Sequence, residues 1–138
     1  MKDYELIEHT ADIGIRVRAK DVNELFKNAA SAMFQIIAEP KTPVILSSPE
    51  LPVKLNAEST EQLFVNWLNE LLSLSATKEL IFCNFKINKI EKNCLEASIS
   101  GRPSDNFHIN TEIKAATYHE LKLEQKKSGW LAEVIFDV

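Results

Sequence analysis

The chain has 138 residues, of which 45% are hydrophobic and 26% are charged. This composition predicts a single globular domain over residues 1–138 and excludes general disorder. Sixteen Lys and Arg against twenty Asp and Glu give a formal net charge of −4, which argues against direct, sequence-specific binding to nucleic acid.

Two periodicities in the sequence predict the secondary structure. Strands alternate apolar and polar residues, whereas amphipathic helices repeat apolar residues at i, i+3, i+4 and i+7. In chain order, we predict strands at 4–9 and 14–19, a helix at 22–38, an edge strand at 44–46 between Pro-rich turns, a strand at 53–57, a helix at 60–76, and strands at 82–92, 95–100, 117–125 and 130–138. This order indicates an α+β fold, a mostly antiparallel sheet with two amphipathic helices packed on it.

Capping signals define both predicted helices. Asp21, followed three residues later by Glu24, is typical of a helix N-terminus, and Pro40 ends the first helix. Ser59 is the expected N-cap of the second helix. The buried stripe of that helix is expected to comprise Leu63, Phe64, Trp67, Leu68, Leu71 and Leu72.

The two cysteines help to predict the cellular compartment of the protein. Cys83 and Cys94 do not form a CxxC pair, and the chain begins with no basic segment followed by an apolar run. We therefore expect two reduced thiols, buried in the core of a cytoplasmic protein, with a redox role as the less favoured alternative. No apolar run approaches the roughly 18 residues of a membrane helix, so no membrane partner is expected.

The first candidate for chemistry is the turn at residues 9–14, His-Thr-Ala-Asp-Ile-Gly. Asp12 can face a ligand, or it can accept hydrogen bonds from its own backbone in an Asx turn, which spacing alone favours. His9 stands at the end of a predicted strand. A histidine in such a place is more often a hydrogen-bonded structural residue than one that binds a ligand.

The second candidate is the acidic end of the last strand, where Asp137 precedes the terminal carboxylate of Val138. If Asp12 lies nearby, three anionic groups meet. Two carboxylates about 4 Å apart repel by ~4 kcal/mol at an effective dielectric of ~20, so they require a retained proton or a cation. An all-oxygen set suits Ca²⁺, Mg²⁺ or Mn²⁺ rather than Zn²⁺. The alternative is a solvated end without a site, and the residues alone do not decide between the two.

The third candidate is Lys114, which enters the last hairpin beside small residues. An exposed charge is the usual role of a lysine; the alternative is a counter-charge to the acidic cluster. His119 is expected on a half-buried strand, donating to a neighbour, and His108 is expected in a loop.

Four segments, taken together, resemble the archease family. They are residues 9–14, residues 67–72 (Trp-Leu-Asn-Glu-Leu-Leu), residues 113–119 (Ile-Lys-Ala-Ala-Thr-Tyr-His) and the closing Phe136-Asp137-Val138. They occur in the family's order, and the resemblance covers nearly the whole chain. Ala116 stands where the family commonly has valine, which changes packing but not chemistry.

The resemblance implies a non-catalytic role. Archeases assist the RtcB-type RNA ligase, which joins RNA ends in tRNA splicing and RNA repair, by promoting its guanylylation and its multiple turnover. The resemblance further implies that Asp12, Asp137 and Val138 hold a divalent metal, calcium first and magnesium or manganese next. It assigns Lys114 and His9 to activation of the partner ligase.

Two other function classes remain open at this stage. A free-standing metal-dependent hydrolase would use the same acidic end, but it needs a general base, and the chain's histidines are His9, His108 and His119. A general chaperone or adaptor would instead bind partners through the sheet edge near residues 40–52.

Overall fold

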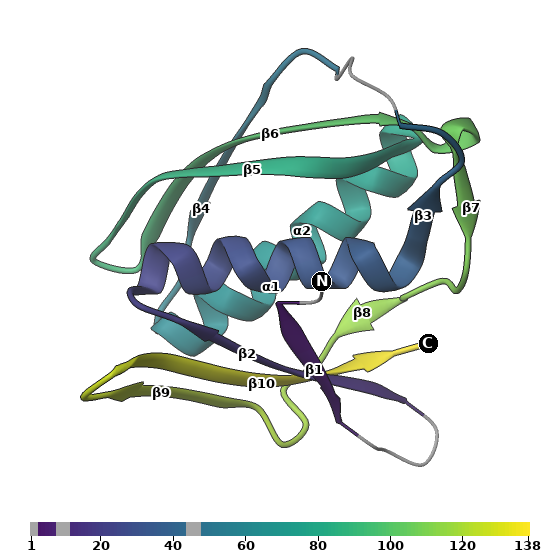
Figure 1. Cartoon of the computed structure of the whole chain (residues 1–138). Coiled ribbons are helices and arrows are strands. Elements are labelled where there is room, and N and C mark those ends of the chain that lie inside the picture. Colours follow the sequence, from purple (N-terminus) through teal and green to yellow (C-terminus); the bar gives the residue numbers. More distant parts are fainter. Residues whose placement is uncertain (1–2, 8–11, 44–47) are drawn as a thin grey trace.

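The computed structural model describes residues 3–7, 12–43 and 48–138 (Figure 1). Within these ranges the fold is α+β, with two long helices and mostly antiparallel strands, as predicted. Helix α1 spans Val22–Ile37 and helix α2 spans Thr60–Lys78. No helix in this part of the chain is long and apolar enough to cross a membrane. The predicted edge strand at 44–46 and the His9 position lie outside the described residues.

Side-chain caps begin both helices where the sequence predicts. The Asp21 carboxylate accepts a hydrogen bond from the Glu24 N–H at 2.8 Å, and the Ser59 hydroxyl accepts one from the Gln62 N–H at 3.1 Å. These bonds satisfy N–H groups that have no partner within the helix. Helix α2 runs two residues beyond its predicted end at 76, to Lys78, and stops at Glu79 in the left-handed conformation.

The larger sheet is built around its last strand. Its order is β1-β2-β10-β8, and β9 also pairs with β10. All these pairings are antiparallel. The bounds of its strands are β1 Tyr4–Ile7, β2 Ile13–Ala19, β8 Ala115–Ala116, β9 Lys122–Lys126 and β10 Gly129–Asp137.

Two smaller sheets complete the fold. One has the order β4-β6-β5, and the other pairs β3 with β7; a short 3₁₀ turn at Ser104–Asn106 leads into β7. Figure 1 shows both helices lying between the three-stranded sheet and the five-stranded sheet. The bounds of these strands are β3 Ala38–Pro40, β4 Leu51–Asn56, β5 Leu80–Glu91, β6 Cys94–Pro103 and β7 Phe107–Ile109.

The core lies where the two helices meet both sheets. Trp67, fully buried on α2, donates from its indole N–H to the Phe26 carbonyl on α1 at 2.9 Å. The Phe26 and Phe64 rings pack edge to face with centroids 5.1 Å apart. The predicted stripe of α2 is buried except at Leu72, which is half-buried.

The predicted strand at 117–125 is wrong in its first half. Residues 117–121 form a turn between β8 and β9, because the Thr117 hydroxyl donates to the Ile135 carbonyl at 2.8 Å and accepts from the His119 N–H at 3.3 Å. Such local side-chain bonds compete with a strand ladder. His119 is therefore exposed in a turn, not on a half-buried strand, and His108 lies on the short strand β7 rather than in a loop.

The cysteines are unpaired, as expected, but they are not buried. Cys83 is exposed and Cys94 is half-buried. The register of β5 against β6 shifts between Phe82 and Asn84, so the irregularity breaks the alternation and leaves Cys83 outside. Cys94 begins β6 beside the hairpin turn, where few neighbours cover it.

Gly101 is required by the close approach of β5 and β6. A Cβ at this position would stand 2.2 Å from the Ile81 carbonyl oxygen, a main-chain atom that cannot move alone. At Gly14 the nearest atoms to an added Cβ are side-chain atoms of Ile135 and Ile7, both at 3.1 Å. A methyl group at Gly101 would therefore displace the backbone, whereas a methyl group at Gly14 would press mainly on side chains.

We predict that Gly101→Ala destabilises the protein by about 3 kcal/mol, because overpacking in a fixed core forces backbone shifts. The matched Gly14→Ala variant should lose clearly less free energy of unfolding than Gly101→Ala. Urea unfolding followed by circular dichroism measures both free energies of unfolding. Equal losses at the two positions would contradict this account of Gly101.

Candidate functional site

The candidate site lies where β10 ends between β2 and β8. Phe136 is opposite Ile13 on one side and opposite Ala116 on the other. In Figure 1 the C-terminal end of β10 lies beside β8. Segments from the beginning, the end and the last quarter of the chain thus meet at one end of the sheet.

The register places the sequence-predicted residues at this end. Asp12 directly precedes Ile13, and Asp137 directly follows Phe136, so each is the next residue beyond the same cross-strand pair. Continuing an antiparallel ladder by one step brings such residues opposite each other. The Lys114 N–H donates to the Asp137 carbonyl at 2.8 Å, which joins the third candidate segment to the second.

These groups are accessible to a partner. Asp137 and Lys114 are exposed, Asp12 is half-buried, and Val138 is 37% exposed. Among the residues that the structure describes, no three His, Cys, Asp or Glu side chains form a metal-binding cluster. The predicted metal site supplies two such side chains, Asp12 and Asp137, with main-chain oxygen from Val138.

The donor chemistry fits a hard divalent cation. Carboxylate and main-chain oxygens are the ligands that Ca²⁺, Mg²⁺ and Mn²⁺ take, and this end of the sheet offers them from Asp12, Asp137 and Val138. Ca²⁺ takes six to eight oxygens, so water or a partner would complete the shell.

Comparisons with known proteins decide the family. The model of the Archease protein family (MTH1598/TM1083) matches residues 4–138. The chain belongs to the archease family. It is 38% identical to "Protein archease" of Methanosarcina mazei, over 99% of this chain and 97% of that protein. It is 36% identical to "Protein archease" of Sulfurisphaera tokodaii, with both chains covered completely.

Solved structures confirm the archease fold. The solution structure of protein 1598 of Methanobacterium thermoautotrophicum matches with a TM-score of 0.74 and 28% identity, and both chains are covered completely. The crystal structure from Thermotoga maritima, described as an archease and "possible chaperone", matches with a TM-score of 0.66 and 28% identity over 96% of this chain and 94% of that one. The resemblance inferred from the four sequence segments is therefore confirmed.

Asn69 on α2 holds this archease site in place. Its amide nitrogen donates to the Ala116 carbonyl at 3.1 Å, and its amide oxygen accepts from the Ala116 N–H at 2.7 Å. The side chain thus pairs with β8 as a neighbouring strand would. In the sequence, Asn69 stands out only as part of the segment 67–72, and the one signal of its role is an amide beside the apolar stripe of α2.

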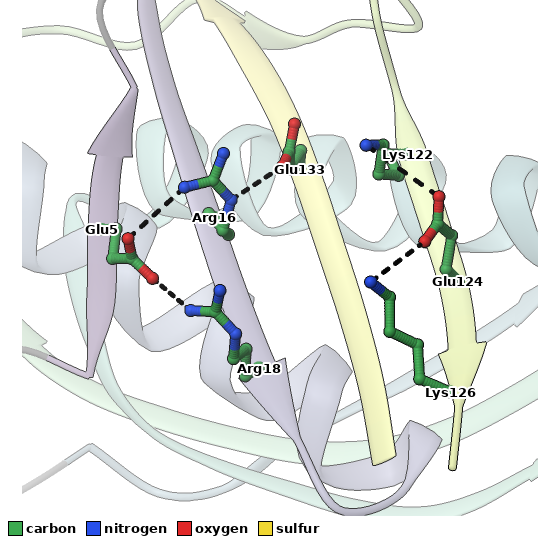
Figure 2. A network of polar contacts seen from close by, with 7 residues as sticks. All are labelled: Glu5, Arg16, Arg18, Lys122, Glu124, Lys126 and Glu133. Atoms are coloured by element: carbon green, nitrogen blue, oxygen red, sulfur yellow. Dashed lines mark hydrogen bonds and ion pairs between the residues drawn. The ribbon is translucent and has the colours of Figure 1, made fainter. Parts of the chain in front are cut away.

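Opposite charges alternate on the face of the archease sheet that carries Arg16 and Arg18. Ile15 precedes Arg16, Val17 lies between the two arginines, and both apolar residues are fully buried. Because side chains alternate along a strand, the arginines lie on the face of the sheet opposite the core. Figure 2 shows Arg16 between Glu5 and Glu133, and Glu124 between Lys122 and Lys126. Four basic and three acidic side chains thus alternate across β1, β2, β10 and β9.

The ion pairs shift two ionisation equilibria. A hydrogen bond from Arg18, followed by the charges of Arg18 and Arg16, lowers the pKa of the Glu5 carboxyl. The hydrogen bond to Glu133, 2.7 Å from Arg16 Nε, raises the pKa of the Arg16 guanidinium. Both pairs lie at the surface, so salt screens them.

We predict that Asn69→Ala destabilises this archease by about 1–3 kcal/mol, because it leaves two main-chain groups of Ala116 without their partner. Asn69→Asp keeps the acceptor but sets a carboxylate oxygen against the Ala116 carbonyl in place of the donor, so it should not restore the stability of wild type. Thermal unfolding measures the order of the three proteins. Wild-type stability in Asn69→Ala would contradict the role of Asn69.

We predict a pH-dependent effect of Glu5→Gln. The folded pKa of Glu5 lies below the ordinary 4.5, so its stabilising contribution is complete above that pH and is lost as the pH falls through the folded value. The variant should unfold at a lower urea concentration than wild type at pH 7, and the gap should close in acid. About 1 M salt should also close the gap at pH 7. A gap that is unchanged in acid would refute this account.

Proposed function

We propose that this archease is a non-catalytic activator of an RtcB-type RNA ligase in the cytoplasm. The observation that carries the proposal is the register of β10, which brings Asp12 and Asp137 to the same end of the sheet, with Lys114 bonded to the Asp137 main chain. The link between these positions and ligase activation comes from the family resemblance of the four sequence segments, and the chain's membership of the archease family supports it. The two unpaired thiols are in keeping with a reducing compartment.

In this proposal Asp12, Asp137 and Val138 hold a divalent ion, calcium first and magnesium or manganese next. When bound, such an ion supplies positive charge next to phosphate oxygens. The protein residues position that charge at an exposed sheet end, where it can reach the nucleotide site of the ligase. Lys114 either neutralises phosphate charge or orients Asp12. His9, outside the described residues, is assigned to activation of the ligase by the family resemblance.

The negative charge of the chain supports a protein partner over direct RNA contact. A chain with a formal net charge of −4 repels an RNA backbone, whereas a ligase that binds RNA must itself present basic surface. Complementary charge then steers the two proteins together. The ligase, in this view, provides all contacts to RNA.

We predict that Asp12→Asn, Asp137→Asn and Lys114→Ala each lower multiple-turnover ligation by roughly tenfold or more, the size of effect seen when metal sites are perturbed. The assay counts joined RNA per RtcB-type ligase with each variant added. Glu124→Gln is the matched control, since it removes one carboxylate from the same sheet at another place. Full activation by all three folded variants would refute the proposal.

Calorimetry tests metal binding separately from activation of the partner ligase. Titration of Ca²⁺, Mg²⁺ and Mn²⁺ into the archease alone should show uptake by wild type and by Glu124→Gln, and weakened uptake by Asp12→Asn and Asp137→Asn. Absence of uptake for all three ions would remove the metal from the proposal. Hydrolysis of a simple phosphoester by the purified chain would favour an enzyme instead.

The chaperone alternative has one specific observation in its favour: the Thermotoga maritima relative is described as a "possible chaperone". That function predicts a different pattern of variant effects. Substitutions at Asp12 and Asp137 should then leave suppression of client aggregation intact, while substitutions at the predicted edge near residues 40–52 should reduce it.

A further inference from the structure

A second site lies away from the Asp12 and Asp137 end. A cavity of about 270 Å³ opens between the C-terminal half of α1, the start of β5, the end of β6 and β7. Its wall contains aromatic side chains and one cationic side chain, Arg102. The aromatic lining residues are Phe34, Phe82, Phe85 and Phe107.

Arg102 is buried without a counter-charge in the described part of the chain. Only 8% of it is exposed, and its Nη1 atom is fully buried and has no hydrogen-bond partner. None of the ion pairs among the described residues includes it. A buried charge is costly unless it is paired, so this guanidinium requires an anion.

The guanidinium is held ready for a ligand. Its central carbon lies 4.9 Å from the centre of the Phe107 ring, which is a cation–π distance. The neighbouring Gly101 lets β6 approach the β5 main chain closely, which positions the backbone of Arg102. Because the side chain is already ordered, a ligand that binds it loses little further conformational freedom.

We propose that this cavity binds a small organic monocarboxylate with an aromatic or branched apolar body. Arginine pairs with a carboxylate through two parallel hydrogen bonds, and Nη1 is a donor without a partner. One cation compensates one negative charge, whereas a phosphate dianion would leave a charge unpaired among phenylalanines. The cavity volume lies near the lower end of ligand pockets, which suits a small molecule.

The test compares acids with their uncharged amides. Benzoate, phenylacetate, 3-phenylpropionate and 4-methylpentanoate, and the amide of each, are titrated into the full chain and followed by amide-resolved NMR. We expect at least one acid to bind ten times more tightly than its amide, with shifts around the cavity. Equal affinity for every acid and its amide, or no binding of any acid at millimolar concentration, would overturn the proposal.

Variants test the role of the charge. Arg102→Met keeps the length of the side chain and should abolish the preference for acid over amide. Arg18→Met removes the same charge from an exposed position and should keep the preference. A preference for acid that persists in Arg102→Met would overturn the assignment. The wild-type comparison of acid and amide stands on its own if Arg102→Met does not fold.

The cysteines give an independent readout in the wild-type chain. Cys83 is exposed and lines the cavity, whereas Cys94 lies at the other end of β6, eight residues from Arg102 along the strand. A saturating acid should slow alkylation of Cys83 by iodoacetamide several-fold and leave Cys94 unchanged. An unchanged rate at Cys83 with bound acid would place the ligand elsewhere and overturn the proposal.

Discussion

The simultaneous pairing of β10 with β2 and β8 is the constraint on which the site depends. Residues 131, 132, 134, 135 and 136 of this strand are all buried, on both of its faces. Ala132, Val134 and Phe136 belong to the core, whereas Leu131 and Ile135 share the outer face with Glu133, which pairs with Arg16. A strand with this much apolar surface is shielded when it lies inside a sheet, with neighbours on both edges. Once β10 is central, its last residues have neighbours from the start of the chain on one side and from residues 115–116 on the other.

Local sequence signals predicted where helices and strands lie better than they predicted which strands pair with each other. Asp21 and Ser59 mark helix starts because their side chains satisfy specific N–H groups, and this effect acts within one turn of chain. Alternation along β10 indicates which residues share a face, but not which strand lies beside it. The meeting of Asp12 with Asp137 therefore stayed open in the sequence; the register pairs their neighbours Ile13 and Phe136, and the contact between the two carboxylates stays a prediction.

The wrong predictions share a physical cause. Thr117 has a β-branched side chain that suits a strand, yet its hydroxyl bonds to the Ile135 carbonyl and turns the chain. Cys83 is apolar enough for a core, yet the irregularity beside Phe82 leaves it outside. In both places one interaction with a distant strand overrides the local pattern, and propensity alone carries no information about it.

Asn69 and Arg102 show two different uses of a polar group in apolar surroundings. Asn69 satisfies both main-chain groups of Ala116, so its burial rigidifies the edge of the sheet that carries Lys114. Arg102 leaves a donor unsatisfied, and its ring contact with Phe107 offsets only part of the cost of burying a charge. A purely structural role would be filled as well by an apolar side chain of similar length. The presence of a buried charge beside an open cavity is therefore explained more directly by an anion that enters the cavity than by the stability of the fold.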